Sequence, residues 1–282
     1  MKIRLVAAKA APSTQELLVA FVNQGKTPDL GRALAKFVGK AQATGDLSTD
    51  ERAANLFYPD ASGQPKRVLF VGLGKAEQRT TEKLRRAAAV AQKRAEALRV
   101  GTFRLLVSDA DLGDVEPTVA GRALAEGLIL GAYRYEKPTG EKAKARHAQR
   151  VELCYGGKGQ KAFAQGVELG RIGAEATVFS RDLENLPGNL ATPTVLAREA
   201  KKLQGANLTV KVLDEAAMAK LKMGALLGVA RGSVQPPKLI VMDYKPAGYK
   251  STVCIVGKGL TFDTGGISIK PSAKMDEMRY DM

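Results

Sequence analysis

Short apolar runs alternate with amphipathic segments along the first half of the chain. The clearest run, RVLFVGLG at residues 67–74, predicts a buried strand. Residues 80–98 repeat alanine and basic side chains at helical period and predict a helix. The same patterns predict strands at 2–7, 16–23, 103–107 and 151–155 and helices at 31–43 and 118–133. Strands that alternate with helices are typical of an α/β fold with a largely parallel sheet.

The second half continues this alternation after an unusually long helical pattern at residues 161–184. It predicts helices at 193–204 and 215–230 and strands at 208–213, 238–244 and 252–257. A chain of 282 residues with 45% apolar residues is long enough for two ordinary domains, each with its own core. Two segments are candidates for the link between them: the lysine- and arginine-rich stretch 135–150 and the helical pattern 161–184.

Charged residues gather around a glycine pair near the end of the sequence, and they are Lys258, Asp263, Lys270 and Asp281. They follow the apolar run 253–256, which predicts a buried strand whose carboxyl end lies near Lys258 and Asp263. Open α/β sheets bind ligands at such ends. Carboxylates without histidine or cysteine favour hard cations such as Mg, Mn or Ca and tolerate Zn. Lys258 can join such a site as a neutral amine, because a bound metal ion lowers the pKa of a nearby amine.

The segment that begins at Met275 adds a further feature. If it is helical, Met278 and Asp281 project from one face, because three residues separate them. The alternative is an ordinary surface, with Asp263 as a turn residue, Lys258 in solvent, and the acids of 276–281 on a charged helix face. Short patterns match by chance often enough that the spacing alone leaves both interpretations open.

Three segments of the sequence resemble a known family. Residues 257–270 (GKGLTFDTGGISIK), followed by Met275, Met278 and Asp281, resemble the metal-site segment of the leucyl (cytosol) aminopeptidases. Residues 181–193 (RDLENLPGNLATP) resemble the start of that family's catalytic domain, and residues 223–240 (MGALLGVARGSVQPPKLI) resemble the segment before its metal-binding strand. The resemblance covers residues 170–282 strongly and the first 150 residues only in outline.

The resemblance implies a role for each residue of the site. Lys258, Asp263 and Asp281 match ligands of the family's centre of two divalent metal ions, Mn or Zn, with Asp263 in the bridging position. Lys270 matches a catalytic lysine that contacts the carbonyl oxygen of the substrate. Met278 matches part of the pocket for the first side chain of the peptide. The implied activity is that of a metalloexopeptidase, a hydrolase that removes N-terminal residues from peptides with a leucine-type preference.

The family's sequence continues beyond the position of Met282 with the motif Asn-Thr-Asp-Ala-Glu-Gly-Arg. That motif supplies further carboxylate ligands and an arginine that holds a bicarbonate ion. We therefore expect an incomplete catalytic domain that binds one ion weakly and the second hardly at all, and a chain that is inactive alone. The resemblance also implies a homo-oligomer, a hexamer, and a helix between the domains. It therefore favours 161–184 as the linker, with an N-terminal α/β domain at 1–158 and a truncated α/β catalytic domain at 159–282.

The formal net charge of +15 adds an alternative from another class, a DNA-binding regulatory protein that uses the basic N-terminal domain. Against it, the basic cluster 134–150 has aromatic residues only at its edge, which is more typical of a solvated surface. The two cysteines, Cys154 and Cys254, lie in apolar runs and are expected to be reduced core thiols. No apolar stretch reaches the length of a signal peptide core or a membrane span, so we expect a cytoplasmic protein with no membrane partner.

Overall fold

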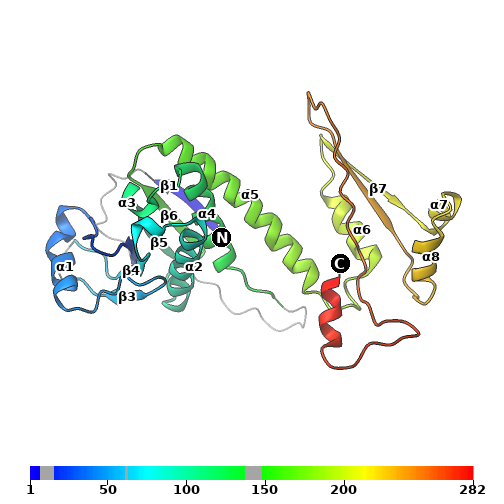
Figure 1. The fold of residues 1–282 in the computed structure, drawn as a ribbon, viewed down its shortest axis with the longest axis horizontal. Coiled ribbons are helices and arrows are strands. Elements are labelled where there is room, and N and C mark those ends of the chain that lie inside the picture. Colours follow the sequence, from blue (N-terminus) through cyan, green and yellow to red (C-terminus); the bar gives the residue numbers. More distant parts are fainter. Residues whose placement is uncertain (7–15, 61–62, 137–147, 282) are drawn as a thin grey trace. The chain divides into compact units, whose positions relative to one another are not determined.

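The computed structural model describes residues 1–6, 16–60, 63–136 and 148–281 of the chain (Figure 1). The chain divides into two compact units, Met1–Val178 and Phe179–Met282. The division falls inside the long helix α5 (Gln160–Glu184), twenty residues after the domain boundary expected at 158 and 159. Most of the basic cluster, including His147, lies outside the described residues.

The first unit is built on a six-stranded sheet with the order β1-β6-β5-β2-β4-β3. Its strands are β1 (Lys2–Val6), β2 (Leu18–Val22), β3 (Ala54–Phe57), β4 (Val68–Gly72), β5 (Thr102–Val107) and β6 (Arg150–Tyr155). Four neighbouring pairs are parallel, and only β3 and β4 pair antiparallel. The prediction of an α/β fold with a largely parallel sheet is confirmed, although the short edge strand β3 was not predicted.

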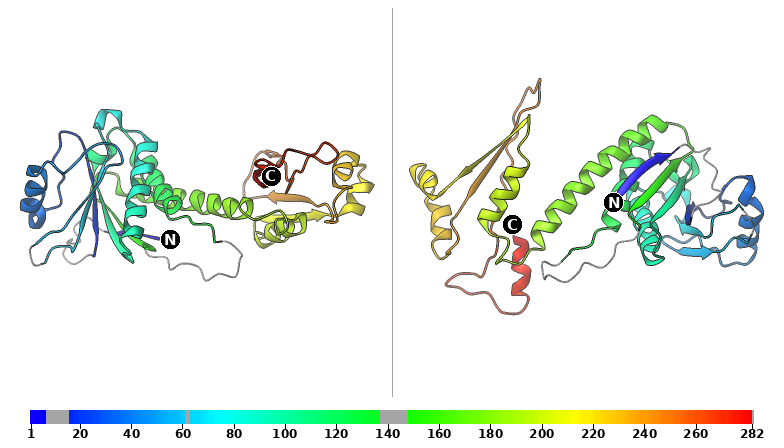
Figure 2. Two further views of the ribbon diagram at one scale, coloured as in Figure 1. Left: turned by 90° about the horizontal axis from the view of Figure 1, so that it is seen from below. Right: turned by 180° about the vertical axis from the view of Figure 1, so that it is seen from behind.

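Helices cover both faces of this sheet, which explains why β2 and β4 are buried along their whole length. Helix α1 (Arg32–Ala43) packs its apolar side on one face, against residues such as Ala20 and Phe70. Helices α2 (Thr81–Ala97) and α4 (Pro117–Gly131) cover the opposite face, against residues such as Phe103 and Leu105. The left view of Figure 2 shows α1 on one side of the sheet and α2 and α4 on the other.

Glycines let the covering helices approach one another closely. A Cβ added at Gly127 of α4 would collide with the carbonyl oxygen of Arg85 in α2. A Cβ at Gly166 of α5 would collide with the carbonyl oxygen of Thr118 in α4. The neighbouring atoms are backbone, which cannot move aside as a flexible side chain can. This glycine seam therefore fixes α2, α4 and the first half of α5 as one tightly packed layer.

Short connecting elements complete the first unit. The turn η1 (Ala76–Gln78) precedes α2, whose amino end is capped by the Thr80 side chain accepting from the backbone N–H of Lys83. The short helix α3 (Asp109–Leu112) follows β5 and begins with a capping box between Ser108 and Asp111. Both elements lie at the carboxyl edge of the parallel strands.

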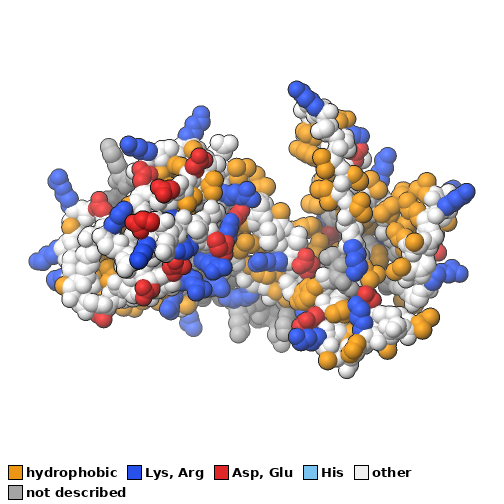
Figure 3. Space-filling view, viewed as in Figure 1, with side chains coloured by type: hydrophobic (Ala, Val, Ile, Leu, Met, Phe, Trp, Pro, Cys, Tyr) orange, Lys and Arg blue, Asp and Glu red, His pale blue; other side chains and the backbone are white. Residues whose placement is uncertain are grey.

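The second unit contains a two-stranded antiparallel sheet and short helices. Its elements are α6 (Pro193–Lys202), β7 (Leu208–Leu213), α7 (Glu215–Lys220), α8 (Gly224–Ala230), β8 (Leu239–Tyr244) and the 3-10 helix η2 (Met275–Asp281). The single helix predicted at 215–230 is wrong, because Lys222 takes a φ of +56° and separates α7 from α8. Hydrophobic side chains are dense over this unit on the face drawn in Figure 3.

The strand predicted at 252–257 is also wrong. These residues have no regular secondary structure, and the side chains of Val253, Ile255 and Val256 are 82%, 90% and 91% exposed. An apolar strand is buried only when neighbouring strands and a covering layer are present, and the described residues place none beside this run. Cys254 is exposed for the same reason, contrary to the expectation of a core thiol, whereas Cys154 is buried in β6 as expected.

Among the described residues, no helix has both the length and the apolar character that crossing a membrane requires.

Candidate metal centre

A sharp turn shapes the loop that carries the predicted site residues. The Asp263 side chain accepts a hydrogen bond from the backbone N–H of Gly265 at 2.8 Å, which closes the turn. Gly265 has a φ of +89°, and a Cβ at this position would collide with the carbonyl oxygen of Ser268. The backbone N–H of Lys270 then donates to the carbonyl oxygen of Thr264 at 2.9 Å. The glycine therefore allows the chain to double back and bring Lys270 beside Asp263.

The centre of the site is an ion pair between these two residues. The Lys270 ammonium lies 2.8 Å from Asp263 Oδ2 and 3.1 Å from the Met278 sulfur. The two charged side chains are about one-third exposed. Three residues predicted for the site thus meet at one point, although they come from a loop and from η2.

Positive charge surrounds the Asp263 carboxylate. The hydrogen bond from Lys270 lowers the pKa of Asp263 below its ordinary value, and the N–H of Gly265 acts in the same direction. The charge of Lys258 lowers this pKa further, so Lys258 also lies within electrostatic reach, although the residue is exposed. Asp263 is therefore held as a carboxylate, the form that can bind a cation.

Residues from the start of the unit support the loop. A Cβ added at Gly188 would lie 3.1 Å from the Cβ of Phe262, so the two chain segments are in close contact. The Tyr280 hydroxyl lies 3.4 Å from the Asn185 side-chain oxygen and can donate to it. Two of the segments that carry the family resemblance are therefore adjacent in space, which sequence spacing did not reveal.

The described donor set suits a cation only in part. Asp263 offers a carboxylate and Lys258 an amine, and the Lys270 ammonium shows that the space beside Asp263 Oδ2 accepts positive charge. Asp281 ends η2, but its side chain lies outside the description. The described residues contain no cluster of three histidine, cysteine, aspartate or glutamate side chains suited to a metal ion. The expected position of the site at the tip of a central strand is wrong, because 252–257 is not a strand.

Comparison with known proteins identifies the family. Residues 18–139 match the model of the N-terminal domain of the cytosol aminopeptidase family, and residues 178–282 match the model of its catalytic domain. The chain belongs to the cytosol aminopeptidase family. Both matched segments correspond to units of the structure, and the catalytic match begins where the second unit begins.

Similar proteins agree with this membership. A probable cytosol aminopeptidase of Nitrosococcus oceani is 38% identical over 258 residues, which are 90% of this chain and 52% of that protein. One from Bdellovibrio bacteriovorus is 44% identical over 225 residues, 77% of this chain and 44% of that protein. The solved structure of the bottromycin maturation enzyme BotP in complex with Mn matches with a TM-score of 0.76 and 31% identity, covering 95% of this chain and 53% of that one.

The chain thus spans about half the length of the curated relatives it matches. The comparisons give no support to the alternative of a DNA-binding regulatory protein. The metal-ligand roles of Lys258, Asp263 and Asp281 and the roles of Lys270 and Met278 stay predictions.

Sequence reasoning missed the direct contact between Lys270 and Asp263. It treated the two residues as separate parts of the site, one for substrate and one for metal. The only signal was the glycine pair between them, which permits a reversal of the chain within seven residues.

Proposed function

We propose that the protein is a metal-dependent aminopeptidase that removes N-terminal residues from peptides. The observation that supports it is the Asp263–Lys270 pair at 2.8 Å, formed within the segment that resembles the family's metal site. A carboxylate held ionised by surrounding positive charge is suited to exchange one cationic partner for another. The peptide-hydrolase class follows from membership of the cytosol aminopeptidase family.

The proposed metal ligands are Lys258, Asp263 and Asp281. Asp263 is proposed to bridge two divalent ions, with Mn or Zn as candidates, and the similar enzyme BotP was solved in complex with Mn. Bound ions would polarise the peptide carbonyl and make water a better nucleophile at neutral pH. Lys258 would bind as a neutral amine. A bicarbonate ion is proposed as a further component of the complete enzyme.

Lys270 is proposed as the catalytic lysine. Its ammonium and a divalent ion would compete for the same oxygen of Asp263, so metal binding would release Lys270 from that carboxylate. The released ammonium could then donate a hydrogen bond to the substrate's carbonyl oxygen, where negative charge develops during hydrolysis. Met278, whose sulfur already lies beside the ammonium, would form part of the wall for the first side chain of the peptide.

The remaining proposals follow from the family. The substrates are peptides with an unblocked N-terminus and a leucine-type first residue, and the assembly is a homo-oligomer, with a hexamer as the specific expectation. The proposed compartment is the cytoplasm, as the relatives' names suggest.

Metal binding to the full 282-residue chain tests the proposal directly. Titration with Mn²⁺, followed by electron paramagnetic resonance of the unbound ion, should show saturable binding. Asp263→Asn should abolish that binding, because the bridging carboxylate loses its charge. Lys270→Met should not lower metal content, since it removes a competitor for Asp263 Oδ2. Lys250→Met provides a control, because Lys250 is an exposed lysine of the same unit.

Hydrolysis of leucine-terminated peptides, with and without an acetylated N-terminus, gives the second measurement. In a preparation that hydrolyses these peptides, Lys270→Met should lower kcat while metal content is retained. Saturable Mn²⁺ binding that survives Asp263→Asn would contradict the proposed centre. Loss of metal from Lys270→Met would show that the lysine's role is misassigned.

A further inference from the structure

The first unit contains a topological switch that the proposed peptidase site does not use. Strands β2 and β5 are parallel neighbours in the sheet. After β2 the chain passes to α1 on one face, whereas after β5 it passes to α4 on the other face. The two connections therefore diverge at the carboxyl ends of these strands. In open α/β sheets, ligands bind in the crevice that such a divergence creates.

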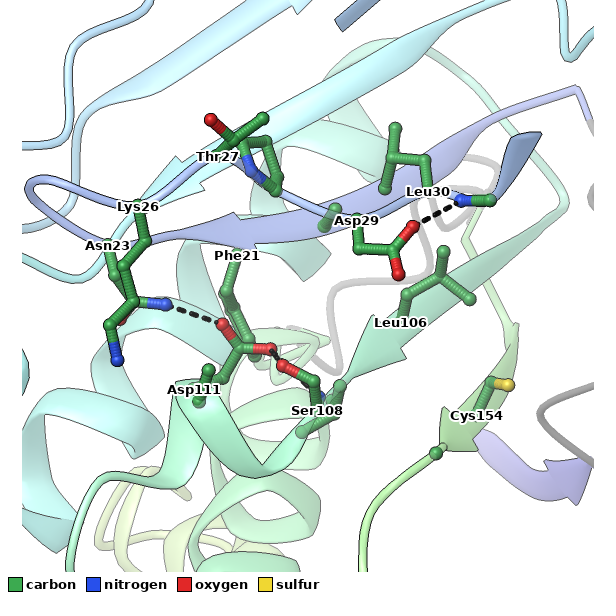
Figure 4. Close-up of a pocket in the computed structure, with 16 residues that line it drawn as sticks. Phe21, Asn23, Lys26, Thr27, Asp29, Leu30, Leu106, Ser108, Asp111 and Cys154 are labelled. Carbon is green, nitrogen blue, oxygen red and sulfur yellow. Dashed lines mark hydrogen bonds between the residues drawn. The ribbon is translucent and has the colours of Figure 1, made fainter. Parts of the chain in front are cut away.

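A cavity of about 520 Å³ lies in this crevice. Its lining comes from the ends of β2, β5 and β6 and from the loop that leads into α1. Phe21, Leu30, Leu106 and Cys154 supply apolar surface, and Figure 4 shows them around the cavity together with polar residues. Pockets of about 300–1,000 Å³ typically bind drug-sized ligands, so this cavity has room for a ligand of that size.

The base of the cavity is held rigid by a buried polar network. Asp111 accepts hydrogen bonds from the Asn23 amide at 2.8 Å and from the Ser108 N–H and hydroxyl at 2.8 and 2.7 Å. The Arg79 guanidinium donates to the Asn23 side chain and to the backbone carbonyl of Asp111. Burial raises the pKa of Asp111, but these contacts satisfy the carboxylate without a ligand. The network therefore shapes the cavity and leaves recognition to other groups.

Two exposed charged residues of the lining are available for recognition. Asp29 uses Oδ1 to accept from the backbone N–H of Gly31 at 2.8 Å. Figure 4 shows its second oxygen turned toward the side of the cavity where Leu106 lies. Lys26 lines the cavity from the same loop, and Figure 4 shows its side chain on the side where Asn23 lies. The cavity thus combines an apolar wall, a carboxylate that can accept from hydroxyl groups, and a cation that can pair with an anion.

We propose that this cavity binds a ribonucleoside 5′-phosphate. The base would lie against Leu30 and Leu106, the ribose 2′-hydroxyl would donate to Asp29 Oδ2, and the phosphate would pair with Lys26. In dinucleotide-binding α/β sheets, an acidic side chain accepts a hydrogen bond from the ribose 2′-hydroxyl in the same way. This site belongs to the first unit and does not depend on the proposed peptidase activity.

Isothermal titration calorimetry on the full chain tests the proposal. The probes are the 5′-monophosphates of adenosine, guanosine, cytidine and uridine, their 2′-deoxy forms, and inorganic phosphate. At least one ribonucleotide should bind saturably, and more tightly than its deoxy form or inorganic phosphate. Lys26→Glu should weaken that binding by roughly tenfold or more, because a charge-assisted contact becomes a repulsion. Lys36→Glu, the same charge change at an exposed position of α1 outside the cavity lining, should leave affinity unchanged.

Asp29→Asn tests the ribose contact separately. Asparagine can still accept from the Gly31 N–H through its oxygen, but its amide nitrogen cannot accept from a hydroxyl. The variant should therefore bind the ribo and deoxy forms equally. Absence of saturable binding by every ribonucleotide at millimolar concentration would overturn the proposal. Equal binding of inorganic phosphate, or affinity that Lys26→Glu and Asp29→Asn leave unchanged, would overturn it as well.

Discussion

Two apolar runs of similar composition differ in burial: one is buried in the first unit, and the other is exposed in the second. In the first unit, β4 is buried along its whole length between β2 and β3, with helices on both faces. In the second unit, residues 253–256 are almost fully exposed and form no strand. The difference lies in the neighbours, because hydrophobic burial stabilises a strand only when other elements remove its side chains from water. Composition predicts a tendency, and the surrounding structure decides whether it is realised.

The largest expected effect comes from truncating a side chain in each run. Phe70→Ala should lower the free energy of unfolding by about 3–5 kcal/mol, because it removes a fully buried ring and leaves a cavity in β4. Val256→Ala should change it by less than about 0.5 kcal/mol, since this side chain is already in solvent. Urea denaturation of the two variants measures both values. A large loss from Val256→Ala would mean that 253–256 is buried in solution.

A second comparison concerns the two glycines of the site loop. Gly265→Ala should strain the turn by about 1–3 kcal/mol, because it requires positive φ and its Cβ would meet the Ser268 carbonyl. Gly266 also has a positive φ, +62°, but Gly266→Ala should cost less, since its Cβ would have no atom within 4 Å. Hydrogen exchange at the Lys270 N–H, which bonds to Thr264, should accelerate more in the first variant. Equal exchange in the two would mean that the turn is not a constraint on Lys270.

The Asp263–Lys270 pair predicts a pH dependence confined to the second unit. Because the folded-state pKa of Asp263 is lowered, the pair's stabilisation is present above the unfolded-state value near 3.8 and is lost as pH falls through the folded-state pKa. Carbon-13 NMR of the Asp263 carboxyl should give a pKa below that value, and Lys270→Met should raise it. Lys250→Met should leave it unchanged. An unshifted pKa in the parent protein would rule out a persistent pair.

The smallest expected effect is at the break between α7 and α8. Lys222→Gly should stabilise the second unit by up to about 1 kcal/mol, because glycine adopts the φ of +56° found here without a steric cost. Lys220→Gly, at the last residue of α7, should destabilise it by up to about 1 kcal/mol. Thermal unfolding of the two variants should therefore shift in opposite directions. Shifts of the same sign would show that α7 continues past Lys222 in solution.

Most of the first unit could be predicted from sequence because its strands are continuous apolar runs and its helices have clear periods. The exceptions are short elements: β3 is a four-residue strand that is only partly buried, and η1 and α3 are too short to show a period. In the second unit, α6, β7 and β8 agree with prediction within a few residues. The break at Lys222 was not predictable, because a positive φ at lysine leaves no compositional signal.

The candidate site shows the same limit. Its residues could be selected from motif resemblance, and the structure brings Asp263, Lys270 and Met278 together. The ion pair between the first two depends on the turn at Gly265, and the contact between Asn185 and Tyr280 joins positions 95 residues apart. Neither can be obtained from local spacing, because each is a property of the folded backbone.

The glycine seam limits which amino-acid substitutions the first unit can accept during evolution. At Gly127 and Gly166 the facing atoms are main chain, so even the smallest side chain would force whole helices apart. Evolution therefore cannot replace these glycines with alanine or serine, as it can at ordinary surface positions. A substitution at either position would require the whole helical layer to shift. We therefore expect these two glycines to be conserved among proteins that share this unit.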